Sequence, residues 1–229
     1  MTTLALSWPA GGHINVAELK EGRRVIVGRS HEAAVVIDDP TVSRQHVSIF
    51  PGSPAHTVEH LSSTNPTRLN GAPVEASAAL SDGDVLTIGT VAVTFHDLAA
   101  RDRRSGPVCH VCRRENDPAD HDCWFCGTSL LNAPTTIREP RPVICRVLAA
   151  GTPAADLYAG RALVLNLDGT IEAMPMRRTP ADASRVEERE GVPFHVPAGN
   201  SRAQELNTGT RVVVGSAVFS VICRPGRAA

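Results

Sequence analysis

The sequence predicts a mainly β protein with three parts: an N-terminal β-sandwich, a small cysteine-rich module and a second, smaller β domain. Three observations support this fold class. Short runs rich in Val, Ile and Thr alternate with turn residues, no long segment has the period of a helix, and four cysteines cluster near the middle of the 229-residue chain. The predicted parts cover residues 1–98, 105–131 and 140–225.

The first part contains several short segments of strand character. Gly, Pro, Asp and Asn separate them, and these residues favour turns. Short strands at regular spacing favour a sandwich whose loops gather at the ends of the sheets. The candidate strands cover residues 25–27, 35–37, 47–50, 85–88 and 91–95.

The charge distribution disfavours nucleic acid as a partner. The chain has 23 basic and 24 acidic residues, spread evenly, and no segment has the basic excess that counterion-driven binding needs. There is no run of about 18 apolar residues that could span a membrane. The opening MTTLALSWPAGG lacks the basic region and apolar length of a secretion signal. We therefore expect a cytoplasmic protein that binds neither nucleic acid nor membranes.

Four short motifs follow one another in the N-terminal part. They are Gly28-Arg29, Ser43-Arg44-Gln45-His46, Ser63-Thr64-Asn65 and Asn70-Gly71. Their order and spacing resemble the GR, SRxH and STNxTxxNG motifs of the forkhead-associated (FHA) domain, and LSDGDVLTIG resembles its closing hairpin. The resemblance covers roughly residues 4–96. It implies a β-sandwich whose loops, at one end, bind a phosphothreonine peptide of a partner protein.

The chemistry of these residues suits a phosphorylated threonine, which carries about −1.5 to −2 charges and three acceptor oxygens. Such a group needs convergent donors, at least one of them cationic. By resemblance, the side chains that meet the phosphate are those of Arg29, Ser43 and Thr64. Arg44 adds a second cation.

Two carboxamides and one imidazole complete the predicted site. Asn65 and Asn70 can donate and accept hydrogen bonds at once, which suits the backbone of an extended peptide. The resemblance implies that His46 braces the loops from inside and does not bind the ligand. Pro66 stands where the family often has glycine, and its fixed φ excludes a left-handed residue there. The shape of this loop and its peptide preference are therefore expected to differ from the family pattern.

The cysteine module has the spacing of a metal site. Its two CxxC pairs, separated by ten residues, are Cys109, Cys112, Cys123 and Cys126. Four thiolates suit one tetrahedral Zn²⁺, and four protein ligands leave no open position, so we expect a single structural zinc. The module resembles a zinc ribbon. A redox dithiol, or His110 or His121 as a substitute ligand, remains an alternative.

The third part repeats a pattern of the first. LNTGTRVVVGSAVFSV (206–221) aligns without gaps to LSDGDVLTIGTVAVTF (80–95). This indicates either a degenerate FHA-like copy or merely two β-hairpins of similar length. Cys145 and Cys223 each lie in a VICR segment and are interpreted as buried thiols of paired strands, with a redox pair as the alternative.

No catalytic motif of the GxxxxGK[ST], GxSxG or HExxH type is present, so we predict that the chain is not an enzyme. The prediction is a signalling adaptor that recognises a threonine-phosphorylated protein, either a Ser/Thr kinase or its substrate. The alternative is a structural component of a larger assembly in which phosphate binding is vestigial.

Overall fold

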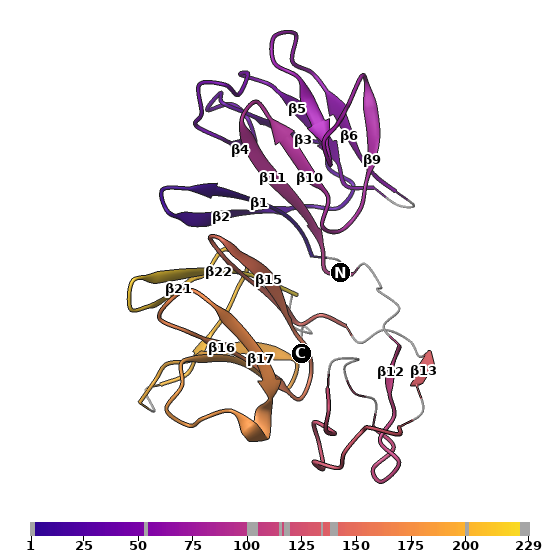
Figure 1. Cartoon of the computed structure of the whole chain (residues 1–229). Helices are drawn as coiled ribbons and strands as arrows, with labels where there is room; N and C mark the ends of the chain where they lie inside the picture. Colours follow the sequence, from indigo (N-terminus) through magenta and orange to yellow (C-terminus); the bar gives the residue numbers. More distant parts are fainter. Residues whose placement is uncertain are drawn as a thin grey trace.

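The protein was analysed as a computed structural model of the whole chain. It describes residues 3–52, 55–99, 105–114, 116, 120–133, 135–137, 142–199 and 202–224. These residues form 22 strands and a single 3-10 turn, Met176–Arg178, so the predicted mainly β fold is confirmed. Two sandwiches stack on one another, and the cysteine module lies beside the second (Figure 1). Among the described residues, no helix has the length and apolar character that crossing a membrane requires.

The first sandwich consists of a six-stranded sheet, ordered β2-β1-β11-β10-β7-β8, and a five-stranded sheet, ordered β4-β3-β5-β6-β9. Fully buried side chains such as Leu6, Val27, Ile49, Leu86 and Phe95 fill the space between the two sheets. The strands are β1 (Leu4–Ala10), β2 (His13–Leu19), β3 (Val25–Gly28), β4 (Val35–Val36), β5 (Val47–Phe50), β6 (His56–His60), β7 (Thr67–Leu69), β8 (Ala72–Pro73), β9 (Ser77–Leu80), β10 (Val85–Ile88) and β11 (Val91–Asp97).

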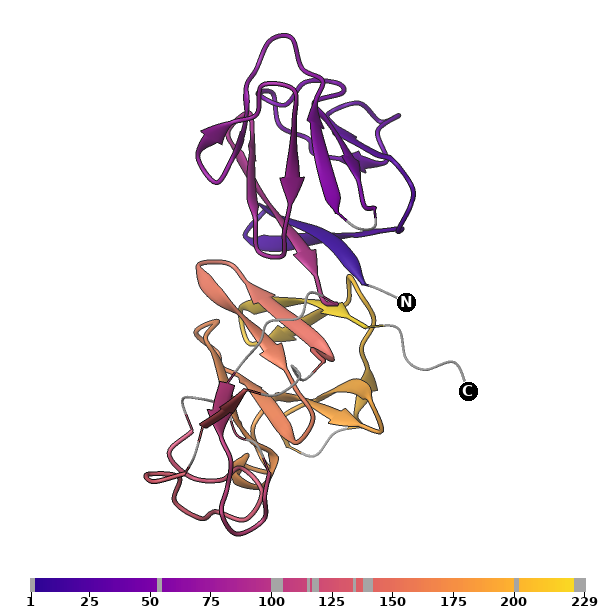
Figure 2. The ribbon, with the colours of Figure 1, turned by 90° about the vertical axis from the view of Figure 1, so that its right-hand side faces the viewer.

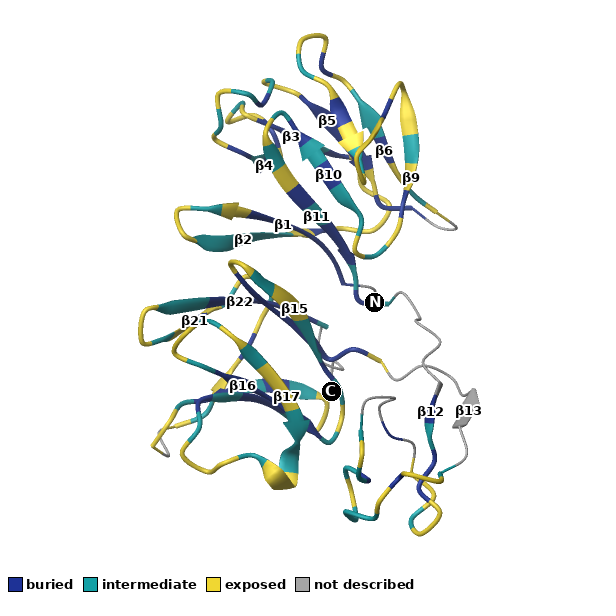
Figure 3. Cartoon of the chain, viewed as in Figure 1, coloured by how far each residue is buried: buried dark blue, intermediate teal, exposed yellow. Residues whose placement is uncertain are grey.

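The second sandwich has a four-stranded sheet, ordered β15-β14-β22-β21, and a five-stranded sheet, ordered β17-β16-β18-β19-β20. Buried positions alternate with more exposed ones along several strands of both sandwiches (Figure 3). The strands are β14 (Cys145–Ala149), β15 (Thr152–Leu157), β16 (Arg161–Leu165), β17 (Ile171–Pro175), β18 (Arg185–Arg189), β19 (Val192–Val196), β20 (Gln204–Glu205), β21 (Arg211–Val214) and β22 (Ala217–Cys223). Two short strands, β12 (Ser105–Pro107) and β13 (Thr135–Ile137), pair beside the cysteine module.

The strand order of the second sandwich repeats that of the first. The series β15-β14-β22-β21 corresponds to β2-β1-β11-β10, and β17-β16-β18-β19-β20 corresponds to β4-β3-β5-β6-β9. The hairpins β10–β11 and β21–β22 also have the same register. Their turns use glycines with nearly equal φ, 84° at Gly83 and 85° at Gly209, then 63° at Gly89 and 62° at Gly215. Shared order and register favour a repeat over two coincidentally similar hairpins.

The copy departs from the first sandwich at its edges. Strand β17 runs antiparallel to β16, whereas β4 runs parallel to β3. Within the described ranges, nothing in the second sandwich corresponds to the β7–β8 hairpin. In the first sandwich, β4 lies between the Gly28-Arg29 and Ser43–His46 motifs, and the β7–β8 hairpin follows the Ser63–Asn65 motif. The repeat therefore preserves the frame and not the parts next to these motifs.

The buried cysteines of the second sandwich lie on adjacent strands, as their VICR segments indicated. Cys145 on β14 is directly opposite Cys223 on β22, and both are free thiols. The neighbouring Cys223 thiol and burial together raise the pKa of Cys145. A buried thiol with a raised pKa is unreactive, so the geometry favours the structural interpretation of this pair over the redox one.

The two sandwiches meet through equivalent sheets (Figure 2). Strands β1, β2 and β11 of the first sandwich face β14 and β22 of the second. The shared apolar cluster contains Ala5 and Leu98 from the first sandwich and Val143, Leu148 and Ile222 from the second. The interface therefore has its own small core.

A buried arginine crosses this interface. Arg146 donates from Nε to Asp156 at 2.7 Å within its own sandwich, and from NH1 to Asp82 of the first sandwich, also at 2.7 Å. The same NH1 lies 3.1 Å from His96 Nδ1, which must be the acceptor because a guanidinium only donates. His96 therefore carries its proton on Nε2 and donates it to Ser7 Oγ, 2.7 Å away.

This geometry makes a prediction about pH. Burial, and then the charge of Arg146, lower the pKa of His96 from 6.5 to about 4. Between these two values the unfolded chain binds a proton that the folded chain does not, so folding stability falls as the pH drops from 6.5 towards 4. The loss attributable to His96 amounts to about 3 kcal/mol at most. Denaturant unfolding across this range should show a flatter pH dependence for His96→Gln, and an unchanged dependence would contradict the assignment.

Candidate functional site

An open pocket of about 720 Å³ lies at one end of the first sandwich. It is formed by the loops that join β3 to β4, β4 to β5 and β6 to β7. The lining residues are Arg29, Ser30, Glu32, Pro40, Val42, Ser43, Arg44, Gln45, Leu61, Ser62, Ser63, Thr64 and Asn65. The pocket therefore contains five of the six predicted phosphopeptide-binding residues, brought together from three separate segments.

The β3–β4 and β4–β5 loops can lie close together because the last residue of β3 is Gly28. A Cβ atom at this position would lie 2.2 Å from the carbonyl oxygen of Arg44, which no larger residue could tolerate. The close approach lets the backbone N–H of Arg29 donate to the carbonyl of Ser43 at 2.9 Å. The GR motif thus places Arg29 beside the Ser43–Arg44 segment.

The positive charges of both pocket arginines, Arg29 and Arg44, have no acidic partner among the described residues. Arg29 donates from Nε to the carbonyl of Val42 at 3.3 Å, which orients its guanidinium. Neither Arg29 nor Arg44 forms an ion pair with any part of the chain that the structure describes. Glu32 is the single acidic residue of the lining. The pocket therefore favours an anion.

The buried hydroxyl of Ser62 joins two of the pocket loops. Its Oγ accepts hydrogen bonds from the backbone N–H groups of Thr64 at 3.2 Å and Asn65 at 3.0 Å. It also shares a hydrogen bond of 2.8 Å with Ser43 Oγ. Ser62 thereby holds the β6–β7 loop in shape and positions the Ser43 hydroxyl.

His46 lies beneath the pocket and is fully buried. The backbone N–H of Ser43 donates to its Nδ1 at 3.0 Å, and its own backbone carbonyl accepts from the N–H groups of Leu61 and Ser62. Burial lowers the pKa of His46, so the ring stays neutral and Nδ1 remains an acceptor. This is the bracing position that the FHA resemblance implied.

Asn65 fixes the rim of the pocket. Its Nδ2 donates to the carbonyl of Thr41 at 2.7 Å, so this hydrogen bond uses the amide nitrogen and not the side-chain oxygen. Thr64 beside it is exposed on the lining. Non-glycine residues with positive φ occur, among the described residues, only at Asn70, Arg113 and Glu190, so the loop through Pro66 contains no left-handed residue, as its proline required.

Asn70 lies outside the pocket, and its predicted contact with the peptide has no support in the geometry. Its φ of 50° places it in the β7–β8 turn. Its Nδ2 donates to Asp84 at 2.8 Å, and its Oδ1 accepts from the backbone N–H of Val85 at 2.9 Å. The carboxamide is engaged at both ends within the protein, so Asn70 connects two turns.

Two supporting residues were not identified from the sequence. Ser62 precedes the STN motif, and serine before a turn was the available signal. Thr41 donates its hydroxyl to Asp39 at 2.5 Å and accepts from the N–H of Thr90 at 2.9 Å. Its carbonyl lies where a Cβ atom at Gly89 would be only 2.4 Å away. The β10–β11 turn therefore supports the pocket loops from the side.

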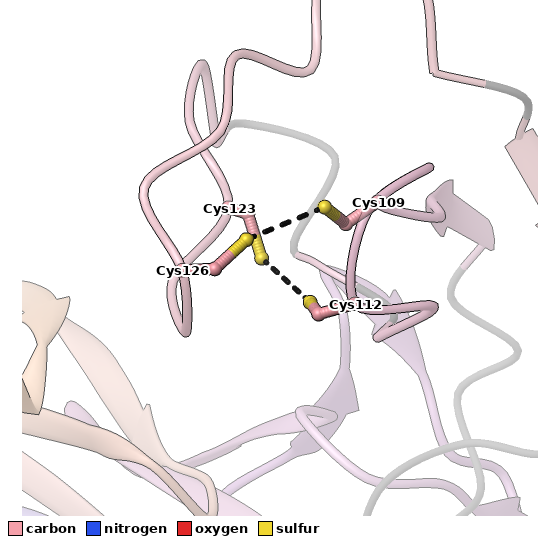
Figure 4. A group of neighbouring side chains, drawn as sticks. All are labelled: Cys109, Cys112, Cys123 and Cys126. Carbon is pink, nitrogen blue, oxygen red and sulfur yellow. Dashed lines mark hydrogen bonds between the residues drawn. The ribbon is translucent and has the colours of Figure 1, made fainter.

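The four predicted metal ligands form one cluster (Figure 4). All four Sγ atoms lie within 4.8 Å of one another, and the Cys109–Cys126 and Cys112–Cys123 pairs are each separated by 3.5 Å. Ligands at about 2.3 Å around a tetrahedral Zn²⁺ would be about 3.8 Å apart. The cluster can therefore hold a metal ion.

The two CxxC turns have the same local structure. Each turn is closed by a backbone hydrogen bond of 2.9 Å to the carbonyl of its first cysteine. The N–H of Arg113 donates to Cys109, and the N–H of Gly127 donates to Cys123. The donor residues both have positive φ, 60° and 75°. The first and fourth residues of each turn, which are its two cysteines, therefore direct their thiols towards the same point.

The thiols of the cluster differ in acidity. Burial raises the pKa of Cys112 to about 12, whereas the hydroxyl of Thr128, 3.1 Å from Cys126, lowers the pKa of that thiol to about 6. Four adjacent thiolates need a compensating positive charge. His110 and His121 are exposed and do not belong to the cluster, so neither replaces a cysteine.

Ser62 provides a test of the pocket geometry. Ser62→Ala removes the acceptor of two backbone N–H groups and should lower the free energy of unfolding by about 1–3 kcal/mol. The matched control is Ser63→Ala, because Ser63 is exposed on the same loop and should change stability little. Chemical denaturation measures both, and equal effects for the two variants would contradict the role of Ser62.

Comparison with known proteins agrees with this geometry. A model of the FHA domain family matches residues 25–89. The ABC transporter ATP-binding/permease protein Rv1747 of Mycobacterium tuberculosis is 39% identical over 80 residues, which cover 34% of this chain and 9% of the transporter. The FHA domain-containing protein FhaA of the same organism is 39% identical over 72 residues, covering 31% of this chain and 13% of FhaA.

A solved structure is also similar to part of this chain. The FHA domain of CT664 from Chlamydia trachomatis is 30% identical and aligns with a TM-score of 0.40, covering 42% of this chain and 97% of that one. The matches to the curated relatives span about a tenth of their length, so those whole proteins do not define this one. From the family match and the pocket geometry, residues 25–89 form an FHA domain.

Proposed function

We propose that the protein is an adaptor that binds a threonine-phosphorylated segment of a partner protein in the FHA pocket. The observation that carries this proposal is that one pocket is lined both by Arg29 and Arg44, which form no ion pair with a described residue, and by the hydroxyl residues Ser43 and Thr64. A doubly charged phosphate is the group that such donors fit.

Each side chain has a defined task in this proposal. Arg29 supplies a charge-assisted fork to the phosphate oxygens, with the hydroxyls of Ser43 and Thr64 as further donors. The side-chain oxygen of Asn65 accepts an N–H of the extended peptide. The half-exposed Leu61 offers an apolar wall for a neighbouring peptide residue. Because Ser62 and His46 hold these groups in place before binding, little ordering entropy is lost.

FHA domains are non-catalytic modules that bind phosphothreonine partners in Ser/Thr-kinase signalling. We extend this to the chain as a whole and propose that it is not an enzyme and that its partner is a Ser/Thr kinase or a kinase substrate. Arg29 and Arg44 form no ion pair with a described residue. This favours active binding over a vestigial scaffold, since a charge without an acidic partner at a binding site has no structural purpose. The proposed location is the cytoplasm, where thiols stay reduced.

We propose zinc as the metal of the cysteine cluster. Four thiolates at tetrahedral spacing suit Zn²⁺, and a site closed by four protein ligands serves structure and not catalysis. The four cysteines would hold the ion and so supply most of the order of the module, whose apolar cluster includes little besides the cysteines themselves, Leu130 and Ala133.

Phosphopeptide binding is tested by calorimetry with peptides selected from a phosphothreonine library. Arg29→Ala should weaken binding by about 10- to 150-fold, because a charge-assisted hydrogen bond contributes about 1.5–3 kcal/mol. Ser43→Ala should cost about fivefold, the value of a neutral hydrogen bond. Phosphoserine peptides should bind more weakly than phosphothreonine peptides, since they lack the γ-methyl group.

The control is Arg24→Ala, which changes the net charge equally but removes an exposed arginine paired with Glu59 outside the pocket. This variant should bind as the wild type does. If no phosphothreonine peptide binds better than its unphosphorylated form, or if Arg29→Ala retains full affinity, the adaptor proposal fails.

Metal analysis tests the zinc proposal. Purified protein should contain about one zinc per chain, and Cys123→Ser should lose it and increase hydrogen exchange over residues 105–131. Cys145→Ser is the control, because Cys145 lies in the second sandwich, outside the cluster. A protein that binds no zinc while its thiols are reduced, or that bridges them by disulfides, would contradict the proposal.

A further inference from the structure

The cysteine module docks on the second sandwich, and one of its two CxxC turns makes the contact. Trp124, inside the second CxxC turn, packs on Gly160, where a Cβ atom would lie 2.4 Å from the indole ring. Arg177, in the 3-10 turn after β17, donates to the carbonyl of the metal-ligating Cys123 at 2.7 Å. The contact therefore includes the backbone of a ligand residue.

Two ion pairs flank this contact. Arg161, the first residue of β16, donates from NH1 to both carboxylate oxygens of Asp120 at 2.7 and 2.8 Å. These side chains are only 11% and 10% exposed, so separating them would leave a buried charge uncompensated. The second pair, Arg178 with Asp122 at 2.9 Å, is much more exposed and contributes less.

The docking residues belong to the same short loop as two of the four metal ligands, Cys123 and Cys126. Asp120, Asp122 and Trp124 lie around Cys123 in the sequence, so their positions depend on how that turn is held. The apolar cluster of the module consists mainly of the four cysteines. Such a small segment has little besides the metal to fix its backbone.

We propose that metal binding and docking form one coupled equilibrium, with Arg161 as a positioning residue of the metal site. This inference rests on the zinc proposal above. Zinc shapes the loop that presents Asp120 and Trp124 to the second sandwich. In return, the second sandwich stabilises the loop conformation that binds zinc. Loss of the metal releases the module and uncovers a surface of the second sandwich that contains Gly160, Arg161 and Arg177.

Coupling of this kind is reciprocal, so a residue that touches no cysteine should change zinc affinity. Zinc affinity of the full-length protein is measured by competition with a chelator. Arg161→Ala should weaken it by about 5- to 150-fold, the usual range for coupled sites. Arg161→Lys, which keeps the charge, should restore part of the loss. Arg211→Ala is the control, because Arg211 contacts Asn15 of the first sandwich and not the module.

Two further measurements separate positioning from general destabilisation. Asp120→Asn alters the pair from the module side and leaves the second sandwich intact, and its effect should not add to that of Arg161→Ala. Trp124 reports docking directly in a Trp8→Phe background, since the chain has two tryptophans. Its emission should shift to longer wavelength when zinc is removed, as the ring leaves Gly160 for water.

The outcomes distinguish the coupling of docking to metal binding from the zinc proposal on which it rests. If the wild type binds no zinc, the zinc proposal itself fails. If zinc binds but Arg161→Ala and Asp120→Asn keep wild-type affinity, the coupling is overturned and the metal site stands. Unchanged Trp124 emission on zinc removal would likewise overturn the coupling.

Discussion

The arrangement of the protein depends on Arg146, whose guanidinium is held between one carboxylate of each sandwich. Burial by itself would lower the pKa of Arg146, but the hydrogen bonds that its guanidinium donates to Asp156 and Asp82 outweigh burial and raise that pKa. A buried guanidinium is tolerated only when its partners are present. Because Asp82 belongs to the first sandwich and Asp156 to the second, both ion pairs of Arg146 form only when the two sandwiches are packed together.

That packing determines which end of the FHA domain is open. Asp82 lies at one end of strand β10, next to the interface, and Gly89 lies at the other end, next to Thr41 of the pocket loops. The sandwich thus contacts its neighbour at one end and offers its recognition loops at the other (Figure 1). A peptide can reach Arg29 and Arg44 without displacing the second sandwich, and the module docks on the far side of the assembly.

The same frame is used twice with different loops. In the first sandwich, the loops carry Arg29, Ser43 and Thr64, and they are held by hydroxyl and imidazole groups beneath them. In the second sandwich, the turn before β16 and the 3-10 turn after β17 receive the cysteine module instead. The shared strand order provides the scaffold, and loop chemistry decides what each copy holds.

The sequence by itself determined the mainly β class, five of the residues that line the pocket and the four cysteines of the cluster. Their information is local: a turn motif or a CxxC pair places its residues within a few positions of one another. Only the tertiary structure decided the role of Asn70, whose carboxamide bonds to Asp84 and Val85, and that of Arg146, whose partner Asp82 lies 64 residues away. The choice of partner across such separations depends on how strands are ordered in a sheet and how sheets face one another. A single chain pattern does not specify that order. The sequence therefore left the repeat as one of two alternatives, and the interface and the docked module became visible only in three dimensions.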